Sequence, residues 1–183
     1  MERGEGTSAE PAIGADGGKL EAHAIIREIK RAGVRFVAAL PDATTSHVLL
    51  RGLLADSDLR VVQVCKEDEG VGVCSGLYCA GERALLLMQE TGLLDSLNAV
   101  RGTAVENEFP VCMMVGLLGK ERGVAPTRSK QYGVRIVEPI LDAMGVRHQL
   151  VEEPEDVARI VPAIEDAYGR LAPVAILIGQ EPR

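Results

Sequence analysis

A cluster of acidic residues lies at a predicted junction between a strand and a helix. Residues 65–81 read CKEDEGVGVCSGLYCAG, which places Glu67, Asp68 and Glu69 at the start of the helix. Acidic side chains at a helix N-terminus complement the helix dipole, and each stabilises the helix by roughly 0.3–1 kcal/mol. A carboxyl group in a water-poor site can also exchange a proton with a bound ligand. The residue types alone allow both roles.

Three glycines, Gly70, Gly72 and Gly76, follow these acids. Glycine inside a helix costs roughly 1 kcal/mol relative to alanine, so their number indicates a helix that approaches another backbone closely. The pattern also resembles the phosphate-binding turn of dinucleotide-binding proteins. The preceding carboxylates would repel a pyrophosphate at the helix N-terminus, which speaks against that role. A non-catalytic or regulatory α/β nucleotide-binding protein remains the alternative function.

Polar turns follow two other predicted strands. The first, PDATTSH, contains Asp42, Ser46 and His47. His47 is a candidate proton shuttle because histidine titrates near neutral pH, although a lone histidine is more often a surface residue. The second turn, Gln89-Glu90-Thr91-Gly92, precedes a helix with Asn98. Thr91 could line a ligand site or serve as the N-cap of an ordinary helix.

A basic loop spans residues 118–133. It contains Lys120, Arg122, Arg128 and Lys130, in a chain whose net charge is −7. Such a charge run is most often a solvated surface. Long loops at the ligand-binding edge of an α/β sheet, however, tend to be functional. Arginine suits an anionic group because its planar guanidinium makes bidentate hydrogen bonds.

The elements that position these residues alternate between helix and strand from Lys19 onward. Continuous apolar strands between helices indicate a parallel sheet covered on both faces. We expect a doubly wound, mostly parallel six-stranded α/β fold, in which ligands bind beyond the carboxyl ends of the strands. The expected strands are 35–40, 59–65, 84–89, 110–116, 146–152 and 173–179, and the expected helices are 20–33, 44–55, 69–80, 93–106 and 134–145. Pro162 should kink a further helical stretch or open a second helix there.

Composition excludes several functional classes. The 183 residues include 46% hydrophobic and only 3% aromatic residues, so we expect an aliphatic core. The acidic balance argues against nucleic acid as a partner. No apolar run approaches the length of a membrane span, and we expect a cytoplasmic protein. Residues 1–18 are Gly-rich and without periodicity, which predicts a disordered tail before one domain at 19–183.

The four cysteines lie among apolar or small residues, and none has the spacing of a metal site. We therefore expect buried free thiols and no metal ligands in this chain. The residues concerned are Cys65, Cys74, Cys79 and Cys112.

Three segments resemble one known family. KEDEGVGVCSGLYCAG, LLLMQETGLLDSLNAV and QYGVRIVEPILDAMGV are similar to the α-subunit of sulfopyruvate decarboxylase and to phosphonopyruvate decarboxylase, both thiamine-diphosphate-dependent decarboxylases. The resemblance covers residues 25–179. It implies that residues 19–183 form the pyrimidine-binding (PYR) domain of the thiamine-diphosphate-binding fold. The family's catalytic glutamate stands nine residues before a glycine, which corresponds to Glu67 before Gly76.

The resemblance implies a role for each candidate residue. Glu67 would hydrogen-bond the aminopyrimidine ring of thiamine diphosphate and so activate it for decarboxylation of a 2-keto acid. Gln89, Thr91, Gly92 and Asn98 would line the cofactor site, with His47 as a second catalytic residue. The substrate, an anionic 3-substituted pyruvate, would be bound by Asp42, Ser46, Arg122 and Arg128. Two departures from the family pattern, Glu90 in place of an amide and Leu94 in place of a glycine, leave the substrate preference open.

The resemblance also implies a missing half. Enzymes of this family hold Mg²⁺ and the diphosphate with a Gly-Asp-Gly segment followed by an asparagine. The one Asp-Gly pair here, Asp16-Gly17, lies in the predicted tail. We therefore expect a separate β-subunit to hold the metal and the diphosphate, and this chain to be inactive alone. The Gly-rich helix also favours a tight symmetric contact, so a hetero-oligomer with self-association is expected.

Overall fold

The computed structural model describes residues 18–183, except for the side chain of Ser46. The Asp16-Gly17 pair and nearly all of the predicted tail lie outside the described residues. Six parallel strands form one sheet in the order β2-β1-β3-β4-β6-β5. The strands are β1 (Phe36–Ala39), β2 (Arg60–Gln63), β3 (Ala84–Gln89), β4 (Cys112–Gly116), β5 (Arg147–Val151) and β6 (Val174–Ile178).

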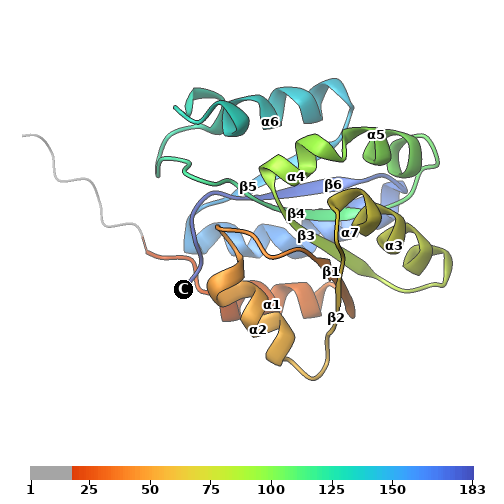
Figure 1. The fold of residues 1–183 in the computed structure, drawn as a ribbon. Helices are drawn as coiled ribbons and strands as arrows, with labels where there is room; N and C mark the ends of the chain where they lie inside the picture. The colour runs from red at the N-terminus through yellow and green to blue at the C-terminus, as the bar shows by residue number, and fades with distance from the viewer. Residues whose placement is uncertain (1–17) are drawn as a thin grey trace, which may run out of the picture.

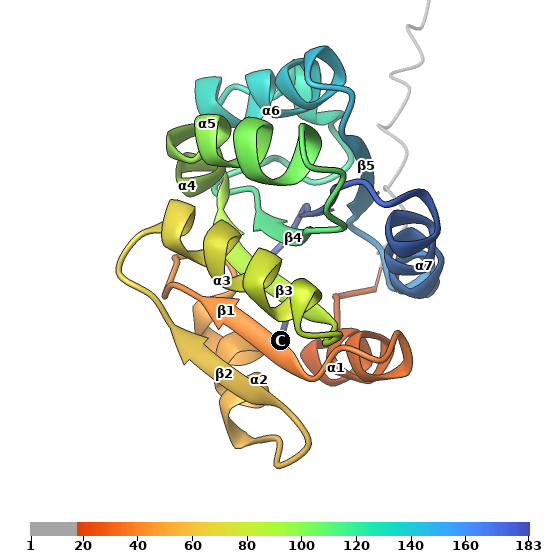
Figure 2. The same cartoon turned by 90° about the vertical axis from the view of Figure 1, so that its right-hand side faces the viewer.

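Helices cover both faces of this sheet (Figure 1). One face carries α1 (Ala22–Arg31), the π-helix η1 (Ser46–Leu50), α2 (Arg51–Ala55), the 3-10 helix η4 (Pro154–Arg159) and α7 (Ile160–Arg170). The other carries α3 (Glu67–Cys79), α4 (Glu90–Asp95), α5 (Leu97–Ala99), the π-helix η2 (Val100–Val105) and α6 (Tyr132–Ala143). A short 3-10 helix, η3 (Pro126–Arg128), lies in the loop before α6. Figure 2 shows α3 in front of the sheet and α2 behind it.

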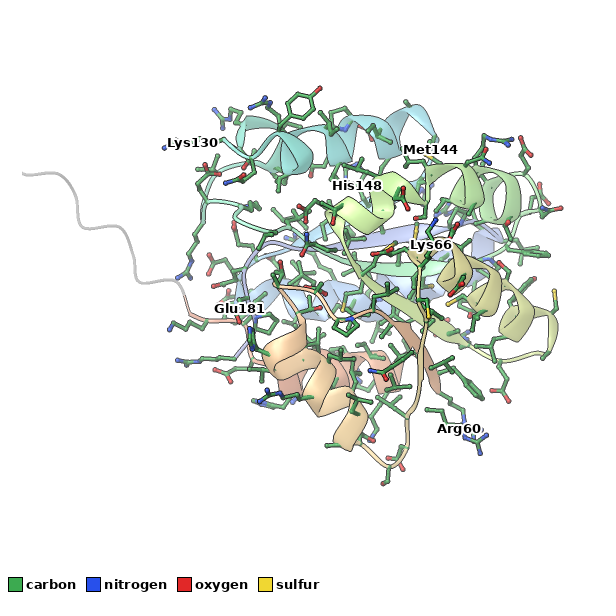
Figure 3. The ribbon with its side chains drawn as sticks, viewed as in Figure 1. Arg60, Lys66, Lys130, Met144, His148 and Glu181 are labelled. Atoms are coloured by element: carbon green, nitrogen blue, oxygen red, sulfur yellow. The ribbon has the colours of Figure 1, made fainter. Side chains whose placement is uncertain are left out.

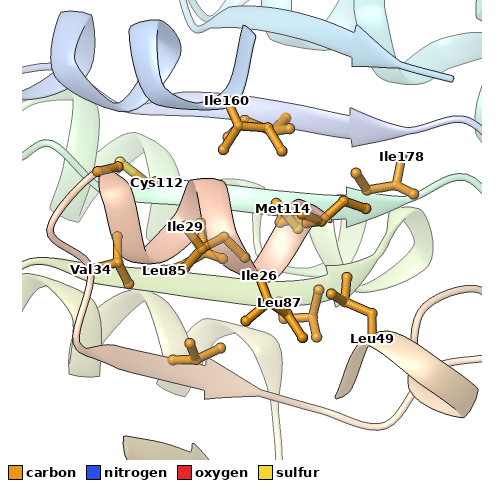
Figure 4. Close-up of a cluster of buried hydrophobic side chains, with 14 of the residues drawn as sticks. Ile26, Ile29, Val34, Leu49, Leu85, Leu87, Cys112, Met114, Ile160 and Ile178 are labelled. Atoms are coloured by element: carbon orange, nitrogen blue, oxygen red, sulfur yellow. The ribbon is translucent and has the colours of Figure 1, made fainter. Parts of the chain in front are cut away.

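An aliphatic core fills the space on each side of the sheet. Alternate residues of β3 point to opposite faces: Leu85 and Leu87 join one cluster, and Leu86 and Met88 join the other. Figure 4 shows the first cluster, where Leu87 lies among side chains from α1 and neighbouring strands. All four side chains have no exposed surface. Because both faces of β3, β4 and β6 are buried, these strands read as continuous apolar runs, as expected for a parallel sheet.

The strand order creates a topological switch beside β1. After β1 the chain runs outward to β2, and it then returns across β1 to form β3. The connections leaving β1 and β3 therefore go to opposite faces of the sheet. Such a switch point, at the carboxyl ends of the strands, is the usual ligand site of an open α/β sheet.

Two helices on this edge begin earlier than periodicity predicts. Helix α3 begins at Glu67 rather than at residue 69, because the Glu69 carboxylate accepts hydrogen bonds from the backbone N–H groups of Cys65 (2.9 Å) and Lys66 (3.3 Å). Helix α4 begins at Glu90, directly after β3, rather than at residue 93. Thr91 is therefore inside the first turn of α4, and the interpretation of Thr91 as an N-cap was wrong.

The helix after β3 is also interrupted, whereas a single helix over 93–106 was expected. The Ser96 hydroxyl donates to the carbonyl oxygens of Gly92 (2.8 Å) and Leu93 (3.2 Å) at the end of α4. Such back-bonding by serine bends helices. Helix α6 begins at Tyr132, two residues before the expected start. Pro162 lies in the first turn of α7, so it opens a second helix after η4 rather than kinking one.

The expectation of four buried thiols was half right. Cys74 and Cys112 are buried, but Cys65 and Cys79 are exposed. Cys65 precedes α3, and Cys79 lies on the outer side of its last turn, so the apolar sequence context did not predict their exposure. From residue 18 to 183, no helix has the length and apolar character needed to cross a membrane.

Candidate functional site

The carboxylate of Glu67 lies directly against the backbone of Gly92. A Cβ atom built on Gly92 would stand 2.1 Å from Oε1 of Glu67 and 2.2 Å from its Cδ. Any residue larger than glycine would therefore displace the Glu67 side chain. The start of α3 therefore packs closely against the first turn of α4. Because Gly92 has no side chain, it leaves the space that the Glu67 carboxylate occupies.

The three acids at the start of α3 have different surroundings. Glu69 caps the helix, as described above, and Asp68 lies 3.5 Å from the ammonium of Lys66. Figure 3 shows Lys66 beside the start of α3. Glu67 is half-buried, and within residues 18–183 its carboxylate has no hydrogen bond or ion pair. Of the three, only Glu67 has a carboxylate without a hydrogen bond or ion pair among the described residues.

Gln89 connects the ends of β1 and β3. Its Oε1 accepts a hydrogen bond from the backbone N–H of Ala43 (3.3 Å), and its Nε2 donates to Oγ1 of Thr91 (3.0 Å). The structure therefore brings the two polar turns together at the topological switch. Gln89, Thr91 and Gly92 are consecutive parts of one surface, with Thr91 exposed and Gly92 buried.

The turn after β1 is held by Asp42. Its carboxylate accepts from the backbone N–H groups of Thr44 (2.6 Å) and Thr45 (2.7 Å), and from the Thr45 hydroxyl. Thr44 packs on Gly116 at the end of β4, where an added Cβ would lie 2.8 Å from Cβ of Thr44. The Thr44 hydroxyl is buried and has no partner among the described residues. A buried hydroxyl of this kind is normally satisfied by water or a ligand. His47, on η1, is exposed.

Glu90 is a buried carboxylic acid at the same edge. Only 5% of its surface is exposed, and its Oε2 accepts a hydrogen bond from the backbone N–H of Leu118 (3.0 Å). Burial raises the pKa of Glu90, and the charge of Asp42 raises it further. The sequence identified this position only as a departure from a family pattern. Its burial follows from packing against the loop after β4.

Asn98 lies away from the contact between Glu67 of α3 and Gly92 of α4. It is exposed, and its side-chain oxygen accepts hydrogen bonds from the guanidinium of Arg101, at 3.3 Å from Nε and 3.0 Å from one terminal nitrogen. The other predicted cofactor-lining residues cluster near Glu67, whereas Asn98 is engaged on the surface of the next helical segment.

Two of the four cations of the basic loop are held in ion pairs and are not simply solvated. The Lys120 side chain has no exposed surface and pairs with Glu152, the residue after β5. Arg122 makes two hydrogen bonds to the carboxylate of Glu153, at 3.0 and 2.6 Å. The Glu121 carboxylate accepts from the hydroxyl of Ser129 (2.8 Å) and closes the loop on itself. Acidic residues after β5 thus fix two of the four loop cations.

The other two loop cations are exposed. Arg128 ends η3, and Lys130 projects from the loop ahead of α6, as Figure 3 shows. Neither side chain makes a hydrogen bond or ion pair within the described part of the chain. The sequence favoured Arg122 and Arg128 because they are arginines, but it could not show which cations are paired, because the acidic partners follow β5, a strand that is distant along the chain. In the structure, Lys120 and Arg122 are held in ion pairs, whereas the side chains of Arg128 and Lys130 are exposed and available to a ligand.

No group of three or more His, Cys, Asp or Glu side chains that could hold a metal ion occurs within residues 18–183.

The fold matches that of a known enzyme. The chain is similar to the structure of 2-oxoglutarate:ferredoxin oxidoreductase from Magnetococcus marinus with 2-oxoglutarate, coenzyme A and succinyl-CoA bound. The TM-score is 0.68 at 19% sequence identity, and the match covers 92% of this chain and 30% of that one. The likeness establishes a shared fold and confirms the doubly wound α/β architecture expected from the sequence.

Sequence comparison finds closer relatives. No family model matches the chain. Sulfopyruvate decarboxylase subunit alpha of Methanocaldococcus jannaschii is 24% identical, over 84% of this chain and 90% of the relative. Sulfopyruvate decarboxylase of Methanosarcina acetivorans is 26% identical over 84% of this chain, but the match covers only 38% of that longer protein. Sulfopyruvate decarboxylase subunit alpha of Methanococcus maripaludis is 30% identical over 158 residues, which are 85% of this chain and 92% of the relative. The chain therefore belongs to the family of sulfopyruvate decarboxylase α-subunits, as the resemblance of its motifs implied.

Proposed function

We propose that this chain is the α-subunit of a thiamine-diphosphate-dependent decarboxylase that acts on an anionic 3-substituted pyruvate, such as sulfopyruvate or phosphonopyruvate. The names of the relatives support the decarboxylase class. The single observation that carries the cofactor assignment is the position of Glu67. It combines an open carboxylate, a glycine backbone beside it and a place at the ligand edge of a parallel sheet.

The surroundings of Glu67 fit a cofactor with a nitrogen-containing ring. A half-buried carboxylate without a protein donor is suited to a hydrogen bond from a ligand. When bound, thiamine diphosphate supplies an electron sink for the loss of carbon dioxide from a 2-keto acid. Glu67 would share a proton with nitrogen N1′ of its aminopyrimidine ring and hold the ring in the reactive tautomer. Gln89 and Thr91 would line the ring's site beside Gly92, and Asn98 would contribute only if it left Arg101.

A β-subunit would hold Mg²⁺ and the diphosphate. The maripaludis and jannaschii relatives are named as α-subunits, which implies a second subunit for those proteins. The acetivorans relative, named without a subunit, is much longer than the matched region. A second half joined to the first in that protein would correspond to a separate chain here.

Within the basic loop, Arg128 is the better candidate for binding the distal anion of the substrate. Its side chain is exposed and open, whereas Arg122 would have to leave Glu153 first. Asp42, whose oxygens are held by its own turn, and Ser46 would contribute to the same edge. His47, exposed on η1, would be the proton shuttle for release of the aldehyde product.

Decarboxylation by the reconstituted pair tests this function. The chain and its β-subunit, with thiamine diphosphate and Mg²⁺, should release carbon dioxide from sulfopyruvate or phosphonopyruvate with a kcat/KM at least tenfold above that for pyruvate. Arg128→Ala should raise KM for the anionic acid by about tenfold or more and change KM for pyruvate little, because only the distal group is affected. Arg122→Ala is the matched comparison and should change that selectivity less. Absence of carbon dioxide from every 2-keto acid would refute the decarboxylase, and equal use of pyruvate would refute the anionic substrate.

Calorimetry tests the division of the site between two chains. Thiamine diphosphate with Mg²⁺ should give no heat with this chain alone, because the diphosphate contacts are expected on the partner, and clear binding once the β-subunit is added. Tight, metal-dependent binding by the single chain would contradict the split site.

A further inference from the structure

Glu90 is buried between the two ends of the 118–133 loop. Its Oε2 accepts from the N–H of Leu118, just after β4, at 3.0 Å. At the other end of the loop, a Cβ on Gly133 would lie 3.7 Å from Cγ of Glu90 and 3.8 Å from Oε1, which is ordinary contact distance. One side chain therefore bonds to the first residue of the loop and faces Gly133 in the first turn of α6.

The Leu118 N–H group is the first backbone donor beyond the sheet on this side. The preceding N–H, that of Leu117, still bonds to the carbonyl oxygen of Ile178, the last residue of β6. Leu118 itself has left the strand register, and its donor is satisfied by Glu90 instead. The Glu90 carboxylate thus takes the place of a carbonyl oxygen from a neighbouring strand. It satisfies the Leu118 N–H at the point where the chain leaves the sheet.

Glu90 is also the first residue of α4, whose Gly92 makes room for Glu67. The neighbouring Gln89 is bonded to the turn after β1. The same short turn thus contacts the β1 turn through Gln89, α3 through Gly92 and the basic loop through Glu90. A shift of the loop start would be transmitted to this turn through one hydrogen bond.

We propose that Glu90 is a positioning residue that fastens the 118–133 loop to the turn that holds Gly92, so that the loop cations and Glu67 keep one relative arrangement. The loop's other attachments, from Lys120 to Glu152 and from Arg122 to Glu153, hold it to the end of β5. Glu90 alone among these contacts joins the loop to α4. The effect of Glu90 on substrate binding rests on the proposed function, whereas its attachment of the loop does not.

Two substitutions separate the hydrogen bond from the charge. Glu90→Leu removes the acceptor and keeps a buried side chain of similar size. Glu90→Gln keeps an oxygen that can accept from Leu118. Glu28→Leu is the matched control, because Glu28 is also 5% exposed but lies on α1, on the other face of the sheet. If a general loss of stability were responsible, this control would loosen the loop as well.

The first readout needs no activity. In the full chain, Glu90→Leu should speed trypsin cleavage after Arg128 and Lys130 by about fivefold or more, and should speed hydrogen exchange of the Leu118 amide by about tenfold or more. Glu90→Gln and Glu28→Leu should stay within about twofold of the wild type in both assays. Unchanged cleavage and exchange in Glu90→Leu, or an equal increase in Glu28→Leu, would overturn the proposal.

The second readout uses the enzyme reconstituted with its β-subunit. Glu90→Leu should raise KM for the anionic 2-keto acid by about tenfold and lower kcat less, because Glu67 itself is retained. Glu90→Gln should restore KM to nearly the wild-type value. A loosened loop with unchanged KM and kcat would overturn the positioning role. An enzyme that is inactive on every 2-keto acid would overturn the proposed function instead, and the cleavage assay would still decide whether Glu90 holds the loop.

Discussion

At the scale of single residues, the position of Glu67 depends on the absence of one carbon atom at Gly92. The sequence identified Glu67 by its register before Gly76 and identified Gly92 as a residue of the cofactor site. Their contact could not be predicted, because a whole strand separates them along the chain and only the packing of α3 on α4 brings them together. Gly92 therefore acts on Glu67 directly, in addition to any contact with the cofactor.

Gly92→Ala tests this contact. The new Cβ would overlap the Glu67 carboxylate, so the side chain must rotate and kcat of the reconstituted enzyme should fall at least tenfold. Gly169→Ala in α7 is the matched control, because its added Cβ would meet nothing within 4 Å. That control should leave kcat unchanged and should stabilise the chain by roughly 1 kcal/mol through helix propensity. Full turnover in Gly92→Ala would show that Glu67 does not need its observed position.

Glu90 gives the stability of the chain a pH dependence of defined sign. Burial raises the pKa of Glu90 above its ordinary value of 4.5, so the folded chain binds this proton more tightly than the unfolded chain. The contribution of Glu90 to stability is therefore full below pH 4.5 and is lost as the pH rises through the raised pKa. Glu90→Gln does not ionise, so its free energy of unfolding relative to the wild type should increase over that range.

Urea denaturation between about pH 2.5 and 8 measures this difference. Asp166→Asn is a control of opposite sign, because a hydrogen bond from Arg170 lowers the pKa of Asp166. The contribution of Asp166 is present above its ordinary pKa of 3.8 and is lost as the pH falls below that value, so the wild type should gain on that variant as the pH rises from about 2.5 to 4. A relative stability of Glu90→Gln that stays constant or decreases with pH would contradict the burial of an ionisable Glu90.

At the scale of elements, helix α3 has an inner and an outer face that its sequence does not distinguish. Gly70 faces β3, where an added Cβ would lie 2.4 Å from a methyl carbon of Leu86, so the close neighbour is a side chain rather than the backbone that the glycines predicted. Gly72 and Gly76 face outward and would meet nothing within 4 Å. Small residues on both faces erase the periodicity that normally identifies the buried side of a helix.

Thiol reactivity reports the same two faces. Burial raises the pKa of the Cys74 thiol to about 12, and burial also raises the pKa of Cys112. Only thiolates react readily with disulfide reagents, so in the isolated native chain Cys65 and Cys79 should react quickly and the other two slowly. All four should react after denaturation. Rapid reaction of Cys74 in the native chain would contradict the packing of α3 on the sheet.

The accuracy of the sequence-based predictions differs between kinds of element. The strand at 84–89 was predicted to the residue, because a fully apolar run between polar turns has one interpretation. The starts of α3 and α4 were missed, because Glu69 reaches back to two backbone donors and because α4 begins directly after the last residue of β3. The ion pairs of the basic loop could not be predicted either, because they join segments that meet only through the strand order.

At the scale of the whole molecule, the sheet order gathers the turns after β1, β3 and β4 at one edge. Ala43, the Gln89-Glu90 pair and Leu118 come from three separate segments, yet two hydrogen bonds connect them. The family relation and the length of the acetivorans relative support an enzyme whose second half is elsewhere. The edge described here would then be one wall of a site completed by the β-subunit.

The turnover of Glu67→Gln in the reconstituted enzyme tests the central claim most directly. If Glu67 shares a proton with the cofactor ring, this substitution should lower kcat by about a hundredfold or more and leave the folded chain intact, as monitored by circular dichroism. Asp68→Asn should change kcat by less than about threefold, because Asp68 is engaged with Lys66. Glu69→Gln should act mainly on stability through the helix cap. Equal losses of kcat in all three variants, or full turnover in Glu67→Gln, would contradict the assignment of Glu67.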